Sequence, residues 1–254
     1  MTEDARRRNE ARFAETAASY AASRAAARLA QNEALHRLAA PRPEDRALDV
    51  ACGPGTLLAA LSPRVRVAIG LDVTPAMLRQ ARARLSGAAA RLVRGAAEHL
   101  PFADGSCSLV TCTSAIHHFG DAARALGEMA RVCAPGGRMV IADLVGAEDE
   151  DVRARQNAIE RTRDPAHVEL RSPRGLLALL QGVGVVPRET AAGAEPRELE
   201  EWCRIANTPP DVARRVREML LASQPGDLAG MSPVLADGQV RFTHRWAVVV
   251  ADRR

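Results

Sequence analysis

The sequence predicts an α/β fold built around a parallel β-sheet, and two observations carry that prediction. Short apolar runs of strand length alternate with segments of helical periodicity between residues 46 and 145, as in a chain of strand–helix units. The first run, residues 48–50, ends in a glycine turn and enters a helix near Thr56. Because ligands of such sheets bind at the carboxyl ends of the strands, we expect the functional site there.

Length and composition fit a single domain with small additions. The chain has 254 residues, 47% apolar but only 3% aromatic, so Ala, Leu and Val fill the core. All 35 positive charges are arginines, interleaved with acids to a net charge of +4, which does not indicate a nucleic-acid partner. No apolar run reaches membrane-spanning length, no signal peptide opens the chain, and the five cysteines lack C-x-x-C spacing. We therefore expect a cytoplasmic protein without a membrane span or a metal site.

Two parts of different composition are expected along the chain. Residues 2–39 favour two helices that separate near residues 19–23, and the prolines of residues 41–43 interrupt the helical pattern. This predicts an N-terminal helical cap over residues 1–40, followed by a main domain over residues 41–254.

Apolar runs and helical periodicity place the elements of the main domain. The expected strands are residues 48–50, 65–71, 91–93, 107–113, 138–144, 185–190 and 240–251. The expected helices are residues 56–62, 75–85, 121–133, 147–163, 173–180, 195–206 and 210–223. Residues 145–172 read as an insertion beside the sheet edge, and residues 195–225 as helical additions.

The glycine turn and a later aspartate predict a nucleoside-binding site. Gly53 and Gly55 allow a tight turn against which a ligand can lie. Asp72 follows Gly55 by 17 residues and closes the second apolar run, where a carboxylate can accept both hydroxyls of a ribose. Asp49, just before the turn, either caps the turn or meets an ammonium group.

Four stretches together resemble the class I S-adenosylmethionine-dependent methyltransferases. They are residues 47–55, 70–72, 95–102 and 131–143, in this order and spacing. The closest branch includes the ubiquinone/menaquinone-biosynthesis and many small-molecule methyltransferases. The resemblance implies a Rossmann-like, seven-stranded, mostly parallel sheet with an antiparallel last strand and helices on both faces. It also implies S-adenosylmethionine as cofactor and a small-molecule methyl acceptor.

The same resemblance assigns roles along the cofactor. It places residues 51–55 by the methionine part, Asp72 at the ribose, Met77 beside the adenine, the Ala97 amide on the base and Thr113 beneath the sulfonium. The family usually has an acid where this chain has Ala96, and Glu98 and His99 are candidate replacements. The candidate cofactor-binding residues are thus Tyr20, Asp49, Ala51, Gly53, Gly55, Asp72, Val73, Met77, Ala96, Ala97, Glu98 and Thr113.

Methyl transfer needs an acceptor held in line, and a base only if the acceptor arrives protonated. His117, His118 and His167 are the candidate bases, although each also fits a structural role in the pocket wall. Arg163 and Arg171, on either side of His167 in sequence, are candidates for holding an anionic acceptor. We expect the two tryptophans in the core.

Two other functions stay open at this stage. A nicotinamide-dependent dehydrogenase would want glycine or alanine at the third turn position, which is Leu58 here. A non-catalytic S-adenosylmethionine-binding protein is compatible with Ala96. The sequence does not identify the acceptor or the oligomeric state.

Overall fold

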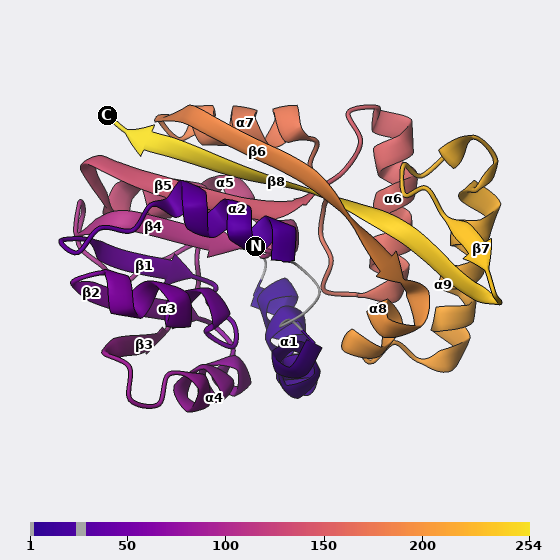
Figure 1. Cartoon of the computed structure of the whole chain (residues 1–254), viewed down its shortest axis with the longest axis horizontal. Coiled ribbons are helices and arrows are strands. Elements are labelled where there is room, and N and C mark those ends of the chain that lie inside the picture. Colours follow the sequence, from indigo (N-terminus) through magenta and orange to yellow (C-terminus); the bar gives the residue numbers. More distant parts are fainter. Residues whose placement is uncertain (1–2, 24–28) are drawn as a thin grey trace.

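The computed structural model describes the backbone of residues 3–23 and 29–254, and the side chains of residues 9–22 and 34–254. Its strands form one sheet (Figure 1). They are β1 (Arg46–Val50), β2 (Val67–Asp72), β3 (Ala90–Arg94), β4 (Cys107–Thr113), β5 (Cys133–Val145), β6 (Val185–Glu198), β7 (Val234–Ala236) and β8 (Gln239–Arg253).

The sheet has the order β3-β2-β1-β4-β5-β8-β6, and the short β7 pairs with β8 outside this path. Strands β1 to β5 pair with one another in parallel, whereas β8 runs antiparallel to both β5 and β6. The prediction of a mostly parallel sheet with an antiparallel last strand is confirmed, but the sheet has eight strands and not the expected seven, because the short β7 adds a hairpin to β8. The strand order reverses between β1 and β4, which opens a crevice at their carboxyl ends.

Nine α-helices surround the sheet in the described part of the chain. They are α1 (Glu3–Ser23), α2 (Leu29–Ala39), α3 (Thr56–Leu61), α4 (Pro75–Arg84), α5 (Ala122–Val132), α6 (Glu150–Arg163), α7 (Pro173–Gly182), α8 (Leu199–Ile205) and α9 (Pro210–Ser223). Local sequence sets several starts, because Asp121, Asp149 and Ser172 accept backbone amides at the N-termini of α5, α6 and α7. None of the described helices is long and apolar enough to cross a bilayer.

Both faces of the sheet are covered by helices. Leu126 of α5 and Leu180 of α7 belong to the core on one face, and Leu35 of α2 and Leu57 of α3 to the core on the other. These side chains are 6% exposed or less, so burial of apolar area holds the layers together.

A buried ion pair fastens α2 to the sheet. Arg138 of β5 lies 2.6 Å from the Asp45 carboxylate and is 5% exposed. The same guanidinium donates to the carbonyls of Ala39 and Ala40 at the end of α2. Since the last carbonyls of a helix have no partner within it, Arg138 both neutralises Asp45 and caps α2.

Helix α1 is placed differently from α2. It crosses the carboxyl-end side of the sheet next to α4 (Figure 1), where Ala17 packs with Ala76 and Met77. Phe13 and Tyr20 pack against the same group. The two helices of the expected N-terminal cap therefore lie in different places. Helix α1 lies over the predicted site, whereas α2 is part of the helical layer that covers one face of the sheet.

The C-terminal helices form a third core beyond the sheet. Trp202 of α8, Ile159 of α6, Leu220 of α9 and Phe242 of β8 pack there. Trp246 packs in the core beneath α2, with its ring against Gly193, where a Cβ would come within 2.4 Å of it. The expectation that both tryptophans are core residues is confirmed.

Three of the differences between the expected bounds and the structure concern α1, β6 and β5. Helix α1 is continuous through residues 19–23 and ends at Ser23. Strand β6 extends to Glu198, so the helix expected from residue 195 begins at Leu199. The reason is long-range pairing, since residues 195–198 continue the antiparallel ladder with β8. Strand β5 likewise begins at Cys133, because that residue already pairs with Cys107.

Candidate functional site

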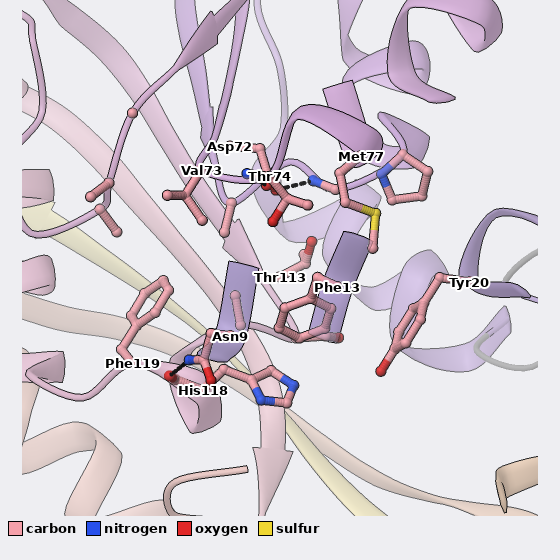
Figure 2. Close-up of a pocket in the computed structure, with 18 of the residues that line it drawn as sticks. Asn9, Phe13, Tyr20, Asp72, Val73, Thr74, Met77, Thr113, His118 and Phe119 are labelled. Atoms are coloured by element: carbon pink, nitrogen blue, oxygen red, sulfur yellow. Dashed lines mark hydrogen bonds between the residues drawn. The ribbon is translucent and has the colours of Figure 1, made fainter. Parts of the chain in front are cut away.

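A cavity of about 840 Å³, partly open to solvent, lies where β1, β2, β3 and β4 end, and α1 closes one side of it (Figure 2). Its wall comes from five segments of the chain. The lining residues are Asn9, Phe13 and Tyr20 of α1; Ala51, Gly53 and Pro54 after β1; Asp72, Val73, Thr74 and Met77 after β2; Gly95, Ala96, Ala97 and Glu98 after β3; and Thr113, Ser114, Ala115, His118 and Phe119 after β4.

The two glycines of the turn, Gly53 and Gly55, have different structural roles. Gly53 has φ +52° and a Cβ on it would meet no atom within 4 Å, so the backbone is open toward the cavity. Gly55 has φ +75°, but a Cβ there would lie 3.1 Å from the Ala81 Cβ of α4. Gly55 is therefore required for helix packing, and it does not line the cavity.

Two non-glycine residues at strand ends adopt the left-handed backbone conformation. Ala51 has φ 55° after β1 and Ser114 has φ 51° after β4, a region that residues with a Cβ seldom occupy. The Ser114 amide donates to the Ala142 carbonyl at 2.7 Å. Both strained residues face the cavity, and such strain often occurs at functional sites.

Asp72 ties the second loop to the glycine turn. One carboxylate oxygen accepts the Gly53 amide and the other accepts the Thr74 amide, each at 2.8 Å. The side chain is 7% exposed, and burial raises the pKa of Asp72 even though these amide hydrogen bonds act against it. A carboxylate has about four lone-pair sites, so about two remain for a ligand.

The loop after β3 is held by side chains around it. The Gly95 amide donates to the Asp72 carbonyl at 3.1 Å, and Arg124 of α5 donates to the Glu98 carbonyl at 3.1 Å. Ala96 and Ala97 bring only backbone and methyl groups to the cavity. Glu98 is 6% exposed, and its Oε1 has no hydrogen-bond partner among the described residues.

Helix α1 closes the cavity with one amide and two aromatic side chains. The Asn9 side chain donates to the His118 carbonyl at 2.9 Å (Figure 2). Phe13 lies edge-on to the His118 ring at 4.8 Å and to Tyr20 at 5.9 Å, as measured between ring centroids. The aromatic pair thus serves both as packing against α4 and as a wall of the cavity.

The three candidate histidines cluster, with ring centroids 4.1 to 6.3 Å apart, but only His118 lines the cavity. Its Nδ1 lies 2.9 Å from the Ala166 carbonyl, which can only accept, so Nδ1 carries the proton. Nε2 is then the nitrogen that can accept a proton. Burial, and next the neighbouring His117, lower the pKa of His118, so the ring is neutral near pH 7.

The other two histidines hold the chain together behind the cavity wall. His117 Nδ1 lies 2.6 Å from Asp143 Oδ1, and the His117 amide donates to Asp143 Oδ2 at 2.9 Å. Burial opposes ionisation of Asp143, but His117 and the hydrogen bonds outweigh it and lower the pKa of that carboxyl. His167 Nε2 bonds to Asn157 Oδ1 at 2.8 Å, which fixes the insertion. Burial lowers the pKa of His167 to about 3.

Several residues predicted for the site lie outside the cavity wall. Asp49 is 1% exposed and accepts the Thr111 hydroxyl at 2.8 Å within the sheet. Arg163 packs over the Trp202 ring at 4.4 Å, and Arg171 lies 3.0 Å from Glu169. Asp49, Arg163 and Arg171 do not line the cavity, and neither do Gly55, His117 and His167. Their placement depends on packing partners far away in sequence.

Some lining residues carried no recognisable sequence signal. Asn9 and Phe119 reach the cavity only because α1 and the turn after β4 fold over it. Pro54 and Thr74 were within reach of sequence reasoning, since they belong to the two loops identified by motif. Among the described residues, the lining has no arginine, and its acidic side chains are Asp72 and Glu98. No three His, Cys, Asp or Glu side chains of the described part of the chain group as metal ligands.

Comparison with known proteins gives a match to residues 48–141 and matches to most of the chain. A family model described as a methyltransferase domain matches residues 48–141. The uncharacterized methyltransferase YcgJ of Bacillus subtilis is 31% identical over 211 residues, which cover 82% of this chain and 83% of that protein. The crystal structure of YcgJ superimposes with a TM-score of 0.83 and 27% identity, over 88% of this chain and 97% of that one.

A second relative matches only part of the chain. A demethylmenaquinone methyltransferase of Thermus thermophilus is 40% identical over 111 residues, which cover 42% of this chain and 50% of that protein. The similarity to this quinone enzyme therefore extends over half of its length, whereas the similarity to YcgJ extends over most of both chains.

Proposed function

The chain belongs to the S-adenosylmethionine-dependent methyltransferases, and from this we propose that the cavity at the ends of β1–β4 binds S-adenosylmethionine beside a small-molecule acceptor. The observation that carries the proposal is the convergence of four strand-end loops on one cavity, with Asp72 bound to the glycine turn. A dehydrogenase is not favoured, because the relatives are methyltransferases.

The strand order supports an orientation for the cofactor. The β3, β2, β1 and β4 ends follow one another along the sheet edge, so an elongated molecule would pass their loops in that sequence. With the ribose at Asp72, the purine lies toward the β3 loop, and the methionine part toward the β1 turn and Thr113. The acidic wall suits a ligand whose sulfonium and ammonium groups are positive. Gly53 leaves room for it, since a Cβ there would project into open space.

The aromatic residues of the cavity wall support an uncharged acceptor with apolar surface. Phe13, Tyr20 and Phe119 line the cavity, although the chain has only seven Phe, Tyr and Trp residues in total (four, one and two). The arginines proposed for an anionic acceptor lie elsewhere, so nothing in the described lining would neutralise a carboxylate or phosphate. Transferring such an anion from water into this wall would be unfavourable.

The cofactor supplies an electrophilic methyl group, and the protein has to hold the acceptor in line and keep water out. Helix α1 provides the cover through Asn9, Phe13 and Tyr20. If the acceptor carries a proton on the reacting atom, His118 is the group placed to take it, because its Nε2 is unprotonated when Nδ1 donates to Ala166. His117 and Asp143 would then act by holding the loop that carries His118.

A pair of matched variants tests the cofactor site. Gly53 and Gly87 both have positive φ, and a Cβ on either would meet no atom within 4 Å, but only Gly53 lines the cavity. Gly53→Ala and Gly87→Ala should each lower the free energy of unfolding by about 1–2 kcal/mol through backbone strain. Calorimetry with S-adenosylhomocysteine should show weaker binding in Gly53→Ala alone. Equal affinity in both variants, or no binding to the unmodified protein, would refute the proposal.

Methyl transfer itself separates an enzyme from a non-catalytic binding protein. Labelled S-adenosylmethionine and a panel of uncharged phenols, hydroquinones and amines, each paired with its carboxylated analogue, should give labelled product from uncharged members. A protein that binds the cofactor but labels no acceptor would favour the non-catalytic alternative. Preference for the carboxylated analogues would contradict the proposed acceptor class.

A further inference from the structure

The turn at residues 164–167, between α6 and α7, lies against the loop that carries His118. The chain is fixed there by its backbone, because the two residues that follow the turn donate their amides to the His117 carbonyl, at 2.9 and 3.1 Å. The turn places the Ala166 carbonyl 2.9 Å from His118 Nδ1. Within the described part of the chain, this is the one hydrogen bond that the His118 ring makes.

Asp164 gives this turn its shape. Its carbonyl accepts the His167 amide and its side-chain Oδ1 accepts the Ala166 amide, each at 3.0 Å, a use of aspartate that is common in turns. These two bonds fix the peptide groups on both sides of Ala166, so the Ala166 carbonyl is held toward His118. Asp164 is 1% exposed, and water therefore does not compete for its oxygens.

Two arginines hold the Asp164 carboxylate in place. Arg12 Nε of α1 donates to the same Oδ1 at 3.2 Å, and an Arg163 nitrogen lies 3.6 Å from Oδ2. Burial opposes ionisation of Asp164, but Arg163, and next His118 and Arg12, outweigh it and lower the pKa of that carboxyl. The turn thus contains an ionised acceptor that is also bound to α1, the helix that closes the cavity.

We propose that Asp164 is a positioning residue for methyl transfer, because it holds the Ala166 carbonyl that keeps the His118 proton on Nδ1 and leaves Nε2 free to take a proton. The inference rests on the proposed role of His118. With a hydroxyl acceptor, the acceptor oxygen bonds to the methyl carbon while the carbon–sulfur bond breaks and its electron pair stays on sulfur. The hydroxyl proton passes to His118 Nε2. Only the tautomer with a bare Nε2 can accept this proton.

Heteronuclear NMR of the histidine rings reports which ring nitrogen carries the proton. The His118 resonances are identified by their loss in His118→Gln. In the unmodified, ligand-free protein they should show the proton on Nδ1, and Asp164→Ala should move both nitrogen resonances toward the averaged positions of a tautomer mixture. Asp164→Asn keeps a side-chain oxygen for the Ala166 amide, so it should keep the tautomer of the unmodified protein.

Methyl transfer to a phenol that the unmodified protein methylates is the second readout. In Asp164→Ala, kcat should fall about fivefold or more, while KM for the phenol and the dissociation constant of S-adenosylhomocysteine stay within about twofold. Asp164→Asn should restore kcat. Asp227→Ala is the matched control, because Asp227 also accepts a backbone amide in a turn, that of Ser232 at 2.7 Å, but does not line the cavity. It should change neither the His118 tautomer nor kcat.

A second substitution keeps the test decisive where Asp164→Ala does not fold. The hydroxyl of Asp164→Ser accepts turn amides more weakly than a carboxylate, so this variant should show the same changes to a smaller extent. A His118 proton on Nε2 in the unmodified protein, an unchanged tautomer in both variants, or an equal change in Asp227→Ala would overturn the inference and leave the cofactor site intact. A shifted tautomer with unchanged kcat would remove His118 as the base and, with it, the positioning role of Asp164.

Discussion

Replacing Asp72 by asparagine is the sharpest test of whether the cavity recognises a ribose. The two Asp72 oxygens accept the Gly53 and Thr74 amides at 2.8 Å. An asparagine side chain keeps one oxygen and places an NH₂ group against the other amide, so one loop amide loses its partner. Leaving a buried donor unpaired costs about 1–3 kcal/mol of folding stability. The variant should still fold, since stabilities of about 5–15 kcal/mol are usual.

The effect on ligand binding is separate from that on folding. Two of the about four lone-pair sites of the carboxylate are free for ribose hydroxyls, whereas the side-chain amide of Asp72→Asn would offer fewer acceptor sites and no negative charge. A hydrogen bond to a charged group contributes about 1.5–3 kcal/mol, so loss of one raises the dissociation constant roughly 10- to 150-fold.

Calorimetry with S-adenosylhomocysteine measures this change, and Asp149→Asn is the matched control. Asp149 also accepts a backbone amide, that of Val152 at 3.0 Å, but at the start of α6 and away from the cavity. The control should keep most of its stability, because asparagine caps a helix about as well as aspartate, and it should keep full affinity. Wild-type affinity in Asp72→Asn, or an equal loss in both variants, would refute the ribose assignment.

Three further predictions concern the buried histidines and the ion pair beneath α2. With an acceptor that enters as a hydroxyl, His118→Gln should lower kcat about 100-fold or more but leave cofactor affinity unchanged; an unaltered kcat excludes His118 as the base. Because the folded pKa of His167 is about 3, below the value of about 6.5 in the unfolded chain, the unfolded state binds more protons. The stabilisation from neutral His167 is therefore fully present above about pH 6.5 and is lost as pH falls, by about 2 kcal/mol at pH 5. When the free energy of unfolding is measured across this pH range, His167→Gln should show a smaller dependence on pH than the unmodified protein. The same dependence in both proteins would contradict the assignment. Arg138→Ala leaves Asp45 buried without its partner and should lower the free energy of unfolding by about 3–5 kcal/mol, whereas Arg138→Ala combined with Asp45→Ala should recover part of the loss.

The sequence predicted the position of residues whose placement depends on local chain geometry. The turn at Gly53 and the carboxylate of Asp72 are each fixed by a strand end and the few residues after it, so their spacing predicted that they would meet. The structure has them joined by a hydrogen bond of 2.8 Å. The role of Gly53 and Asp72 in binding a cofactor stays a prediction.

The local sequence pattern did not reveal packing partners that lie far away along the chain. Gly55 looked like a ligand-facing glycine, but it is required by Ala81 of α4. Asp49 looked available to a ligand, but its position in β1 turns it toward Thr111 of β4. Strand β6 extends into residues that resemble a helix, because β8 offers them a long antiparallel partner.

The sequence alone determined the fold class, the strand ends that form the site and the family. Those properties follow from hydrophobic periodicity and from turns whose geometry is set within a few residues. Only the tertiary structure decided which candidate side chains line the cavity, that α1 closes it with aromatic residues, and that Glu98 Oε1 is buried without a hydrogen-bond partner among the described residues. Burial and pairing are properties of groups brought together from distant parts of the chain, and the local sequence pattern does not encode those distances.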